Sequence, residues 1–204
     1  GQWNGAADAE GNGIAWTFDG KLVAGTQWTG AVSGSLEKTY DADFRLSGLG
    51  VNGGVAVAFV YDGDGFPTGA GELAVSRDAA SGQATGLALD QVTEARTYNG
   101  FGELVEQVVT GPAGALYSAK LQRDKLGRIT EKAETVDGAT AVYRYGYDDA
   151  GRLVSVDKDG AAARYAYDVN GNRLRAEDTT GSEDAVYDEQ DRLVRRGAAI
   201  FTWD

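Results

Sequence analysis

A short motif recurs along the chain: aromatic residues, an acid, a polar segment with glycine, then arginine and leucine. The three clearest copies are YGYDDAGRLVSV, YAYDVNGNRLRA and AVYDEQDRLVRR, whose acids Asp148, Asp168 and Asp188 lie 20 residues apart. A regular period of this length is typical of repeat architectures, in which each copy forms the same supersecondary unit. This repeat constrains the fold more than any local propensity does.

Weaker copies extend the series towards the N-terminus. The spacing of the anchor positions drifts, which is expected of hairpins with variable loops and not of a solenoid with identical rungs. Because the final copy, Trp203-Asp204, stops where the others enter a turn, we expect the chain to be a segment of a longer protein. The further anchor positions are Asp19, Asp41, Asp62, Asp78, Asn99, Asp124 and Asp204.

Each copy has the features of a β-hairpin. Aromatic residues two apart share one face of a strand. An Asp at the first position of a type I turn caps the backbone through its side chain, and a glycine three residues later supplies the positive φ of a bulge. The residues that we assign to this structural motif are Tyr40, Asp41, Tyr61, Asp62, Gly65, Asn99, Gly102, Asp124, Gly127, Arg128, Tyr145, Tyr147, Asp148, Gly151, Arg152, Tyr165, Tyr167, Asp168, Gly171, Arg173, Tyr187, Asp188 and Arg192.

Two copies replace the turn glycine. Asp191 tolerates the left-handed conformation reasonably well, whereas Phe44 does not. We therefore expect the turn that begins at Asp41 to differ from the others.

Another copy departs in length. Asn172 is interpreted as a one-residue insertion before Arg173, which should make the turn at Asp168 wider than the turn at Asp148. The arginines that follow the turns should pair with the turn acids, each exposed pair contributing about 0 to 1 kcal/mol. These arginines are Arg152, Arg173 and Arg192.

Second turns return the chain within each period. Their signals are the glycine-ended segments 136–138, 157–160 and 179–181. The best helix candidate, Glu103 to Val109, falls where the repeat requires a strand. The sequence therefore predicts an all-β fold of repeated antiparallel β-hairpins that form an open, twisted, curved sheet.

Composition excludes several function classes. The 19 Lys and Arg against 31 Asp and Glu give a net charge of −12, which would repel nucleic acids and anionic membranes. The absence of Cys and His removes disulfides, the usual zinc sites, cysteine nucleophiles and Ser-His-Asp triads. No apolar run approaches the length of a membrane helix.

The repeated Tyr-Asp turn followed by Gly-Arg-Leu resembles the YD repeats of RHS proteins, found in bacterial polymorphic toxins, in shell components of insecticidal toxin complexes and in teneurins. The segments FVYDGDGFPTGAGELAVSRDAASG and LQRDKLGRITEKAETVDG are similar to a bacterial RHS core. The resemblance covers residues 36–204 well, as the repeat array, and residues 1–35 only loosely, as a degenerate repeat or N-terminal flank.

The resemblance implies a hollow shell of β-sheet that encloses or presents a toxin or adhesion domain, secreted or at the cell surface. This chain would be wall material without catalytic residues, cofactor or metal. Its partners would be the rest of its own shell and an enclosed toxin domain. Larger relatives carry a self-cleaving motif with Asp-Pro, which this sequence lacks because Pro67 and Pro112 follow Phe66 and Gly111.

Chemical alternatives rest on the turn acids. Segments 62–72 and 168–178 begin like calcium loops but fail the twelve-residue pattern at Phe66 and Arg173. A glycoside hydrolase needs two carboxylates, yet acids are so frequent here that no pair is distinguished. Both sets have a complete explanation as hairpin turns.

Two surface roles remain open. The tyrosines could form an aromatic strip for a glycan or cell-surface partner, or cross-strand aromatic ladders that hold hairpins together. Unpaired strand edges predict edge-to-edge self-association, opposed by the net charge of −12. The tyrosines concerned are Tyr143, Tyr145, Tyr147, Tyr165 and Tyr167.

Overall fold

The structure is a computed structural model that describes residues 4–203. These residues form twenty β-strands and no helix, so the predicted all-β class is confirmed. The described part of the chain accordingly offers no helix of the length and apolar character needed to cross a membrane. The chain divides into two units, Gly1–Gln91 and Val92–Asp204, which are described separately.

The first unit is an antiparallel meander in which each strand pairs with the next along the chain. Its strands are β1 (Gly5–Ala7), β2 (Gly13–Asp19), β3 (Leu22–Thr29), β4 (Gly34–Tyr40), β5 (Leu46–Val51), β6 (Val57–Tyr61), β7 (Pro67–Ala70), β8 (Leu73–Arg77) and β9 (Ala84–Leu89).

The second unit continues the same pattern of sequential antiparallel pairing. Its strands are β10 (Val92–Tyr98), β11 (Leu104–Gly111), β12 (Gly114–Arg123), β13 (Ile129–Val136), β14 (Ala139–Tyr147), β15 (Leu153–Lys158), β16 (Ala161–Tyr167), β17 (Arg173–Asp178), β18 (Gly181–Tyr187), β19 (Leu193–Arg196) and β20 (Ala199–Ile200). The segment weighed as a helix, 103–109, falls largely in β11, as the repeat requires.

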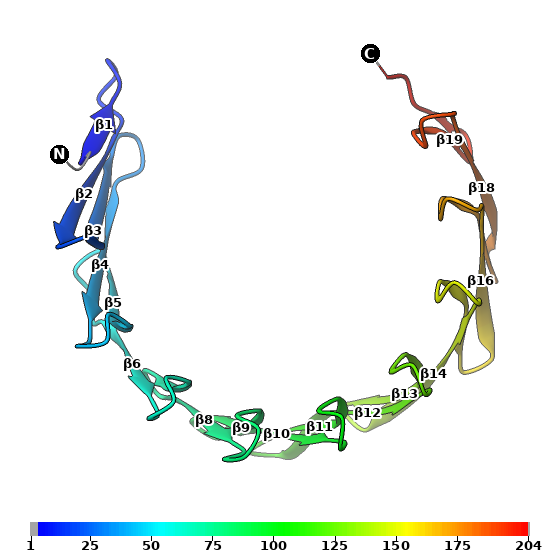
Figure 1. Ribbon diagram of the computed structural model, residues 1–204, viewed down its shortest axis with the longest axis horizontal. Helices are drawn as coiled ribbons and strands as arrows, with labels where there is room; N and C mark the ends of the chain where they lie inside the picture. The colour runs from blue at the N-terminus through cyan, green and yellow to red at the C-terminus, as the bar shows by residue number, and fades with distance from the viewer. Residues whose placement is uncertain (1–3, 204) are drawn as a thin grey trace. The chain divides into compact units, whose positions relative to one another are not determined.

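In a meander, successive turns lie at opposite ends of the strands, so each unit has two rims. The acid turns follow the even-numbered strands β4 to β8 in the first unit and β10 to β18 in the second, so within each unit they share one rim. In the second unit, the sheet is curved and its loops fold towards the concave side (Figure 1). The predicted open, curved sheet of hairpins is confirmed.

Tight two-residue turns occupy the other rim. Between β13 and β14, Asp137 and Gly138 have φ of 48° and 81°, and between β15 and β16, Asp159 and Gly160 have φ of 50° and 92°. Two consecutive positive φ values match the right-handed twist of the flanking strands. The predicted returns at 136–138, 157–160 and 179–181 are confirmed.

Neither unit has a second layer that covers its sheet. Among the described residues, Ala119, 5% exposed, is the only buried hydrophobic residue. Strands such as β16 alternate between a half-buried face, which carries Tyr165 and Tyr167, and an exposed face with Arg164 and Ala166. We call the first the tyrosine face. A sheet without a core must be held together by interactions within and between its hairpins.

The expectation that the Asp41 turn would differ is wrong. Phe44 adopts the left-handed conformation, with φ of 63°, and donates its N–H to the carbonyl of Asp41 at 3.0 Å. The Asp41 carboxylate also accepts bonds from Asp43 N and Arg45 N, both at 2.9 Å. These bonds impose the turn on a residue that disfavours it. The Phe44 side chain is 75% exposed, so no packing fixes the backbone instead.

We predict that Phe44→Gly stabilises the protein by about 0.5 to 1 kcal/mol, because glycine removes the left-handed strain at a smaller entropic cost. Urea unfolding followed by far-UV circular dichroism measures the change. Phe44→Ala is the matched control: it removes the same ring but keeps the strain, so it should give no gain. Equal stability of the glycine and alanine variants would show that the turn is unstrained.

Candidate functional site

The repeated feature of the structure is a five-residue turn closed by its first acid. In the turn that begins at Asp148, the acid's N–H donates to the carbonyl of Arg152 at 3.0 Å, and Gly151 N–H donates to the carbonyl of Asp148 at 2.9 Å. The carboxylate of Asp148 accepts from Arg152 N at 2.8 Å and from Arg152 Nε at 2.7 Å. The predicted Asp cap, turn glycine and Asp–Arg pair are therefore found together here.

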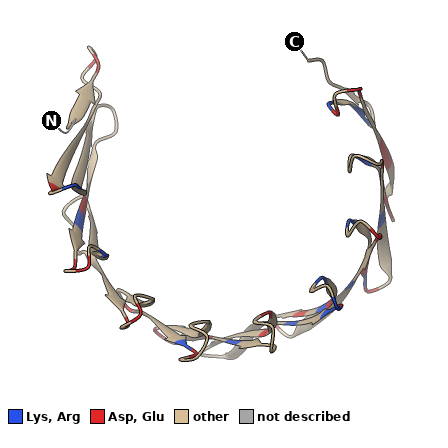
Figure 2. Cartoon of the chain, in the orientation of Figure 1, with Lys and Arg blue, Asp and Glu red and all other residues tan. Residues whose placement is uncertain are grey.

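The same carboxylate contacts recur in both units. Aspartate and arginine four residues apart pair through Nε at 2.7 to 2.8 Å for Asp41, Asp124 and Asp188. Figure 2 shows acidic and basic segments together in the loops of each unit. The acids are acceptors within their own turns, which is a structural use of the carboxylate.

These bonds shift the titration of the acids. The bond from the Arg152 backbone N–H, followed by that from its guanidinium, holds the pKa of Asp148 below its usual value of 3.8. The backbone N–H of Arg192 has the largest effect on Asp188 and lowers its pKa likewise. The cause is the same in both turns: the N–H donors bind the ionised carboxylate more strongly than the protonated carboxyl group, and this lowers the pKa.

A second interaction joins each hairpin to the one before it. The hydroxyl of Tyr167, directly before the turn acid Asp168, donates to the carbonyl of Leu153 at 2.9 Å. Leu153 is the fifth residue after the preceding acid, Asp148. Four other tyrosines make the corresponding bond: Tyr40 to Val23, Tyr61 to Leu46, Tyr147 to Ile129 and Tyr187 to Arg173. We call this bond the inter-repeat clamp.

The arginines of the turns at Asp124 and Asp148 reinforce the clamp. The guanidinium carbon of Arg152 lies 5.1 Å from the ring centroid of Tyr167, and its Nη1 donates to the carbonyl of Asp168. Arg128 lies 4.8 Å from the centroid of Tyr147 and donates to the carbonyl of Asp148 at 3.4 Å. One arginine thus contacts its own acid, the next tyrosine and the next turn.

Where the tyrosine is missing, arginine makes the clamp. Arg77, directly before Asp78, donates from Nε to the carbonyl of Pro67 at 3.1 Å. Pro67 is again the fifth residue after an acid, Asp62. The cation and the ring have exchanged positions, because Arg77 lies 5.3 Å from the centroid of Phe66, which occupies the usual arginine position.

A complete exchange occurs in the turn at Asn99. The amide of Asn99 donates to Glu103 Oε2 at 2.7 Å, so an Asn–Glu bond replaces the Asp–Arg pair. Arg123 takes the tyrosine position and donates Nη2 to the carbonyl of Leu104 at 3.3 Å. Its Nε lies 3.9 Å from Glu103. The acid position of this turn is neutral and the arginine position is acidic, while the connection between hairpins is kept.

Sequence reasoning missed these substitutes because it searched for aromatic residues before the acid. The available signal was the Arg-Asp dipeptide at residues 77–78 and 123–124. Trp203 is a third substitute, whose Nε1 donates to the carbonyl of Leu193 at 2.9 Å. The shared requirement is a side-chain N–H or O–H donor at one position.

The interpretation of Asn172 as an insertion is wrong. Asp168 N–H donates to the carbonyl of Asn172 at 3.0 Å, the same length as the closing bond at Asp148. Asn172 occupies the usual arginine position and donates Nδ2 to Asp168 Oδ2 at 2.9 Å. The turn has the standard five residues because the asparagine supplies both bonds that the arginine would make to the acid.

It follows that Arg173 does not pair with the turn acid, contrary to expectation. Arg173 pairs with Tyr167 across the strands, in the register that Leu153 occupies opposite Tyr147 one repeat earlier. Its guanidinium carbon lies 5.6 Å from the centroid of Tyr165. An arginine therefore occupies an apolar position of the repeat.

The tyrosines do not form the expected cross-strand aromatic ladders. Tyr145 lies opposite Val156 and Tyr165 lies opposite Ala176. The stacked pair, Tyr143 and Tyr145, is two residues apart on one strand, with centroids 6.5 Å apart. Tyrosines do connect hairpins, but through hydroxyl bonds and arginine contacts, because the neighbouring strand offers no ring at the opposite position.

Sequence reasoning also missed a turn at Asp8. Its carboxylate accepts from Glu10 N and Asn12 N at 2.9 Å, and Asn12 Nδ2 donates back to it at 2.9 Å, as in the Asp168 turn. Gly11 has the expected positive φ of 86°. The spacing Asp-x-x-Gly at residues 8–11 was the available signal. This turn follows β1 and so lies on the other rim of its unit.

The loops considered for calcium have structural bonding of this kind. Asp62 Oδ1 accepts from Asp64 N at 3.0 Å and from Phe66 N at 2.9 Å. Within residues 4–203, no group of three or more acids is arranged to hold a metal ion. The Asp62 carboxylate therefore caps its own turn, as the other turn acids do.

The fold and the clamp define the class of the protein: a repeat protein built from Tyr-Asp hairpins. The chain belongs to the Teneurin YD-shell family, whose model matches residues 4–204. The predicted relation to YD-repeat proteins is confirmed. No curated protein matches the chain.

Two solved structures are similar in fold to this chain. A crystal structure of TcdB2–TccC3 is similar with a TM-score of 0.79 and 14% identity, over 95% of this chain and 13% of that one. A Photorhabdus luminescens Tc holotoxin pore structure has a TM-score of 0.59 and 14% identity, over 92% of this chain and 10% of that one. The chain therefore spans a small part of the length of these proteins.

We predict that Tyr167→Phe lowers the free energy of unfolding by about 1 kcal/mol, because it removes the clamp to Leu153 and leaves that carbonyl without its donor. Tyr165→Phe is the matched control on the same strand, since the Tyr165 hydroxyl makes no hydrogen bond within the described residues. Denaturant unfolding of both variants measures the difference. Equal losses would show that the clamp contributes nothing.

We predict that Asp148→Asn destabilises the protein at neutral pH and that the difference disappears in acid. The folded-state pKa of Asp148 is depressed, so its stabilisation is present above the unfolded value near 3.8 and is lost as pH falls through the lower folded value. Denaturant midpoints from pH 7 down to about pH 2 measure it. Asp149→Asn removes the same charge one residue away and is the matched control; at neutral pH it should cost less stability than Asp148→Asn, because no hydrogen bond to the Asp149 carboxylate is found within the described residues. A pH-independent difference for Asp148→Asn would contradict the assignment.

Proposed function

We propose that this chain is a non-catalytic wall segment of a shell that encloses or presents a toxin or adhesion domain. The observation that carries the proposal is the clamp, which adds one hairpin to the next without a hydrophobic core. Such a construction can be lengthened by repeats. The YD-shell family is a structural shell fold, and the turn carboxylates are occupied as caps.

The relatives support the partners in this proposal. TccC3 occurs with TcdB2 in one structure and in a holotoxin pore in another. By analogy, the partners of this chain are the remaining repeats of its own shell and an enclosed toxin domain. Export of the whole protein, to the medium or to the cell surface, is part of the same proposal.

We further propose that residues 36–204 are the repeat array and residues 1–35 a degenerate flank. The hairpin between β2 and β3 closes with Asp19 opposite Leu22, without the five-residue acid turn. The Asp8 turn lies on the opposite rim. Both features distinguish the start of the chain from the regular repeats that follow.

The alternative of a glycan-binding or adhesion module with an aromatic strip has less support. Tyr143 lies between two lysines from its neighbouring strands, with Lys132 Nζ at 4.4 Å and Lys158 Nζ at 5.2 Å from the ring centroid. A sugar that stacked on this ring would have to displace an ammonium group. The wall function does not require either lysine to leave the ring of Tyr143.

Wall segments join through their strand edges, and β20 presents one. Phe201 N–H donates inward to the carbonyl of Val194 at 3.0 Å, so by alternation the N–H of Ile200 faces the open edge. The Ile200 side chain is 77% exposed. An unpaired edge of this kind is a template for another strand.

We predict concentration-dependent self-association of the chain, weakened by Ile200→Pro, which removes the outward N–H of β20. Analytical ultracentrifugation over a concentration series measures it. Ile200→Thr is the control, since it keeps the N–H and a β-branched side chain. A strict monomer at every concentration would contradict the proposal, as would equal association of the proline variant and the parent. Added salt should strengthen association by screening the charge of −12.

A further inference from the structure

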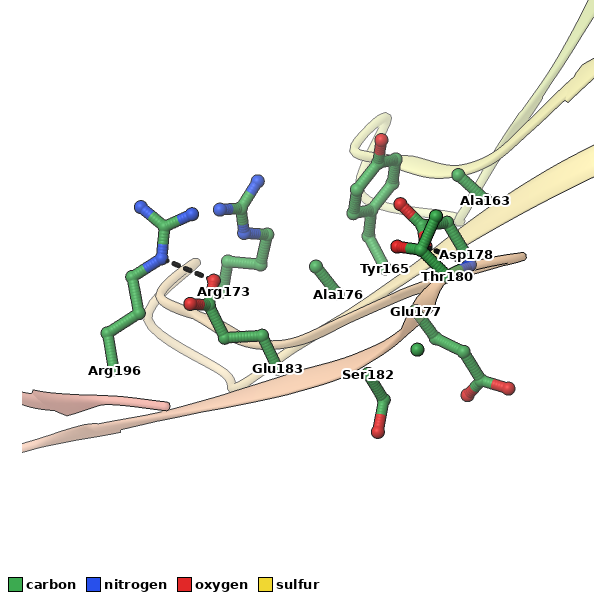
Figure 3. Close-up of a pocket in the computed structure, with 11 residues that line it drawn as sticks. Ala163, Tyr165, Arg173, Ala176, Glu177, Asp178, Thr180, Ser182, Glu183 and Arg196 are labelled. Atoms are coloured by element: carbon green, nitrogen blue, oxygen red, sulfur yellow. Dashed lines mark hydrogen bonds and ion pairs between the residues drawn. The ribbon is translucent and has the colours of Figure 1, made fainter. Parts of the chain in front are cut away.

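A cavity of about 460 Å³ opens where the second unit departs from its repeat. Ala163 and Ala176 line it, at positions that Tyr143 and Val156 occupy exactly one 20-residue period earlier. The smaller side chains leave unfilled the space that the ring of Tyr143 takes up in the preceding repeat. In Figure 3, Ala176 lies between Arg173 and Tyr165, and Ala163 lies on the other side of Tyr165.

Two guanidinium groups border the cavity. Arg173 occupies the register that is Leu153 one repeat earlier and Leu193 one repeat later, and it makes no ion pair within residues 4–203. Arg196 donates Nε to Glu183 at 2.6 Å. Figure 3 shows both arginines pointing to the same side of the sheet. This border therefore carries one more cation than anion, in a chain whose net charge is −12.

The opposite border offers hydrogen-bond acceptors and donors. Thr180 Oγ1 donates to Asp178 Oδ1 at 2.6 Å in the two-residue turn after β17. The ring of Tyr165 forms a further wall, and its hydroxyl makes no hydrogen bond within the described residues. The cavity thus has a cationic border and a hydroxyl- and carboxylate-bearing border.

We propose that this cavity, the Arg173 cavity, binds a saccharide that carries a carboxylate, such as a uronic acid. The carboxylate would pair with the free guanidinium of Arg173, since arginine recognises this group through paired N–H donors. The sugar hydroxyls would bond to Asp178, Thr180 and Glu183, and the volume is in the range of small-molecule sites. A polyacidic peptide fits less well because these acids and the net charge of −12 would repel its further carboxylates.

The site is independent of the shell function, because it does not depend on the strand edges. It shares Tyr165 with the aromatic strip but does not require stacking on Tyr143. Binding to a polar, open cavity is expected to be of millimolar strength and to weaken as salt screens the carboxylate–guanidinium pair. NMR titration of the ¹⁵N-labelled chain with D-glucuronate, at low and at high salt, measures this directly. Methyl glucoside, which lacks the carboxylate, is the matched ligand control.

Three variants define the site. Arg173→Leu restores the residue of the neighbouring repeats and should weaken glucuronate binding at least about tenfold. Ala163→Tyr restores the ring of the preceding repeat and should abolish binding by filling the cavity. Arg175→Gln is the control, because Arg175 lies on the same strand with its side chain on the opposite face, paired with Glu177 and Asp184.

The expected result is glucuronate binding with shifts at amides around residues 173–183, lost in the first two variants and unchanged in the third. Absence of glucuronate binding at low salt would overturn the proposal. So would equal affinity for methyl glucoside, or unchanged affinity after Arg173→Leu or Ala163→Tyr. Far-UV circular dichroism of each variant confirms that the sheet is retained before binding is compared.

Discussion

A side-chain hydrogen bond from one hairpin to the backbone of the previous hairpin is the interaction on which the rest of the structure depends. With Ala119 as the only buried hydrophobic residue among residues 4–203, packing cannot hold the sheet as it holds a layered domain. Backbone pairing joins neighbouring strands. The clamp adds a side-chain bond that attaches the start of an acid turn to the strand that follows the previous turn, as at Tyr147 and Tyr167.

The clamp specifies a bond and not a residue. Tyrosine, arginine and tryptophan all provide a donor that reaches the carbonyl, as at Tyr167, Arg77 and Trp203. At Arg77, where arginine replaces the clamp tyrosine, an aromatic residue replaces the turn arginine. Arg77 therefore lies over Phe66, so a contact between a cation and a ring is kept with the two partners exchanged. Such compensated exchanges explain how repeats diverge strongly in sequence while hairpin geometry is retained.

Periodicity was sufficient to predict the strands and the two kinds of turn, because these depend on local backbone preferences that short motifs encode. The family was predicted from the resemblance of the Tyr-Asp turn and Gly-Arg-Leu to known YD repeats. The misassignments at Phe44 and Asn172 have a common cause. Each was judged from one residue's propensity, whereas the turn is set by several bonds that act together. The donors Arg77 and Arg123 were missed because the search was for an aromatic residue before the acid, although the Arg-Asp dipeptide was present in the sequence. The Arg173 cavity was missed because it depends on residues from four strands, β16 to β19.

In a single-layer sheet, a regular repeat and a ligand site require different side chains at the same positions. In the repeat with Asp148, Arg152 and Tyr167, the arginine covers the ring of the tyrosine, and the position after the arginine is an apolar leucine. The tyrosine face is therefore covered by side chains at that point. The Asp168 repeat lacks this contact. Asn172 occupies the usual arginine position and keeps the turn, and Arg173 occupies the next position, which is apolar in the neighbouring repeats. Alanines then leave space beside it. The turn is preserved because Asn172 makes both bonds to Asp168, so the arginine at the next position does not have to pair with the acid. The Arg173 cavity therefore coincides with three departures from the repeat: Asn172, Arg173 and the two alanines.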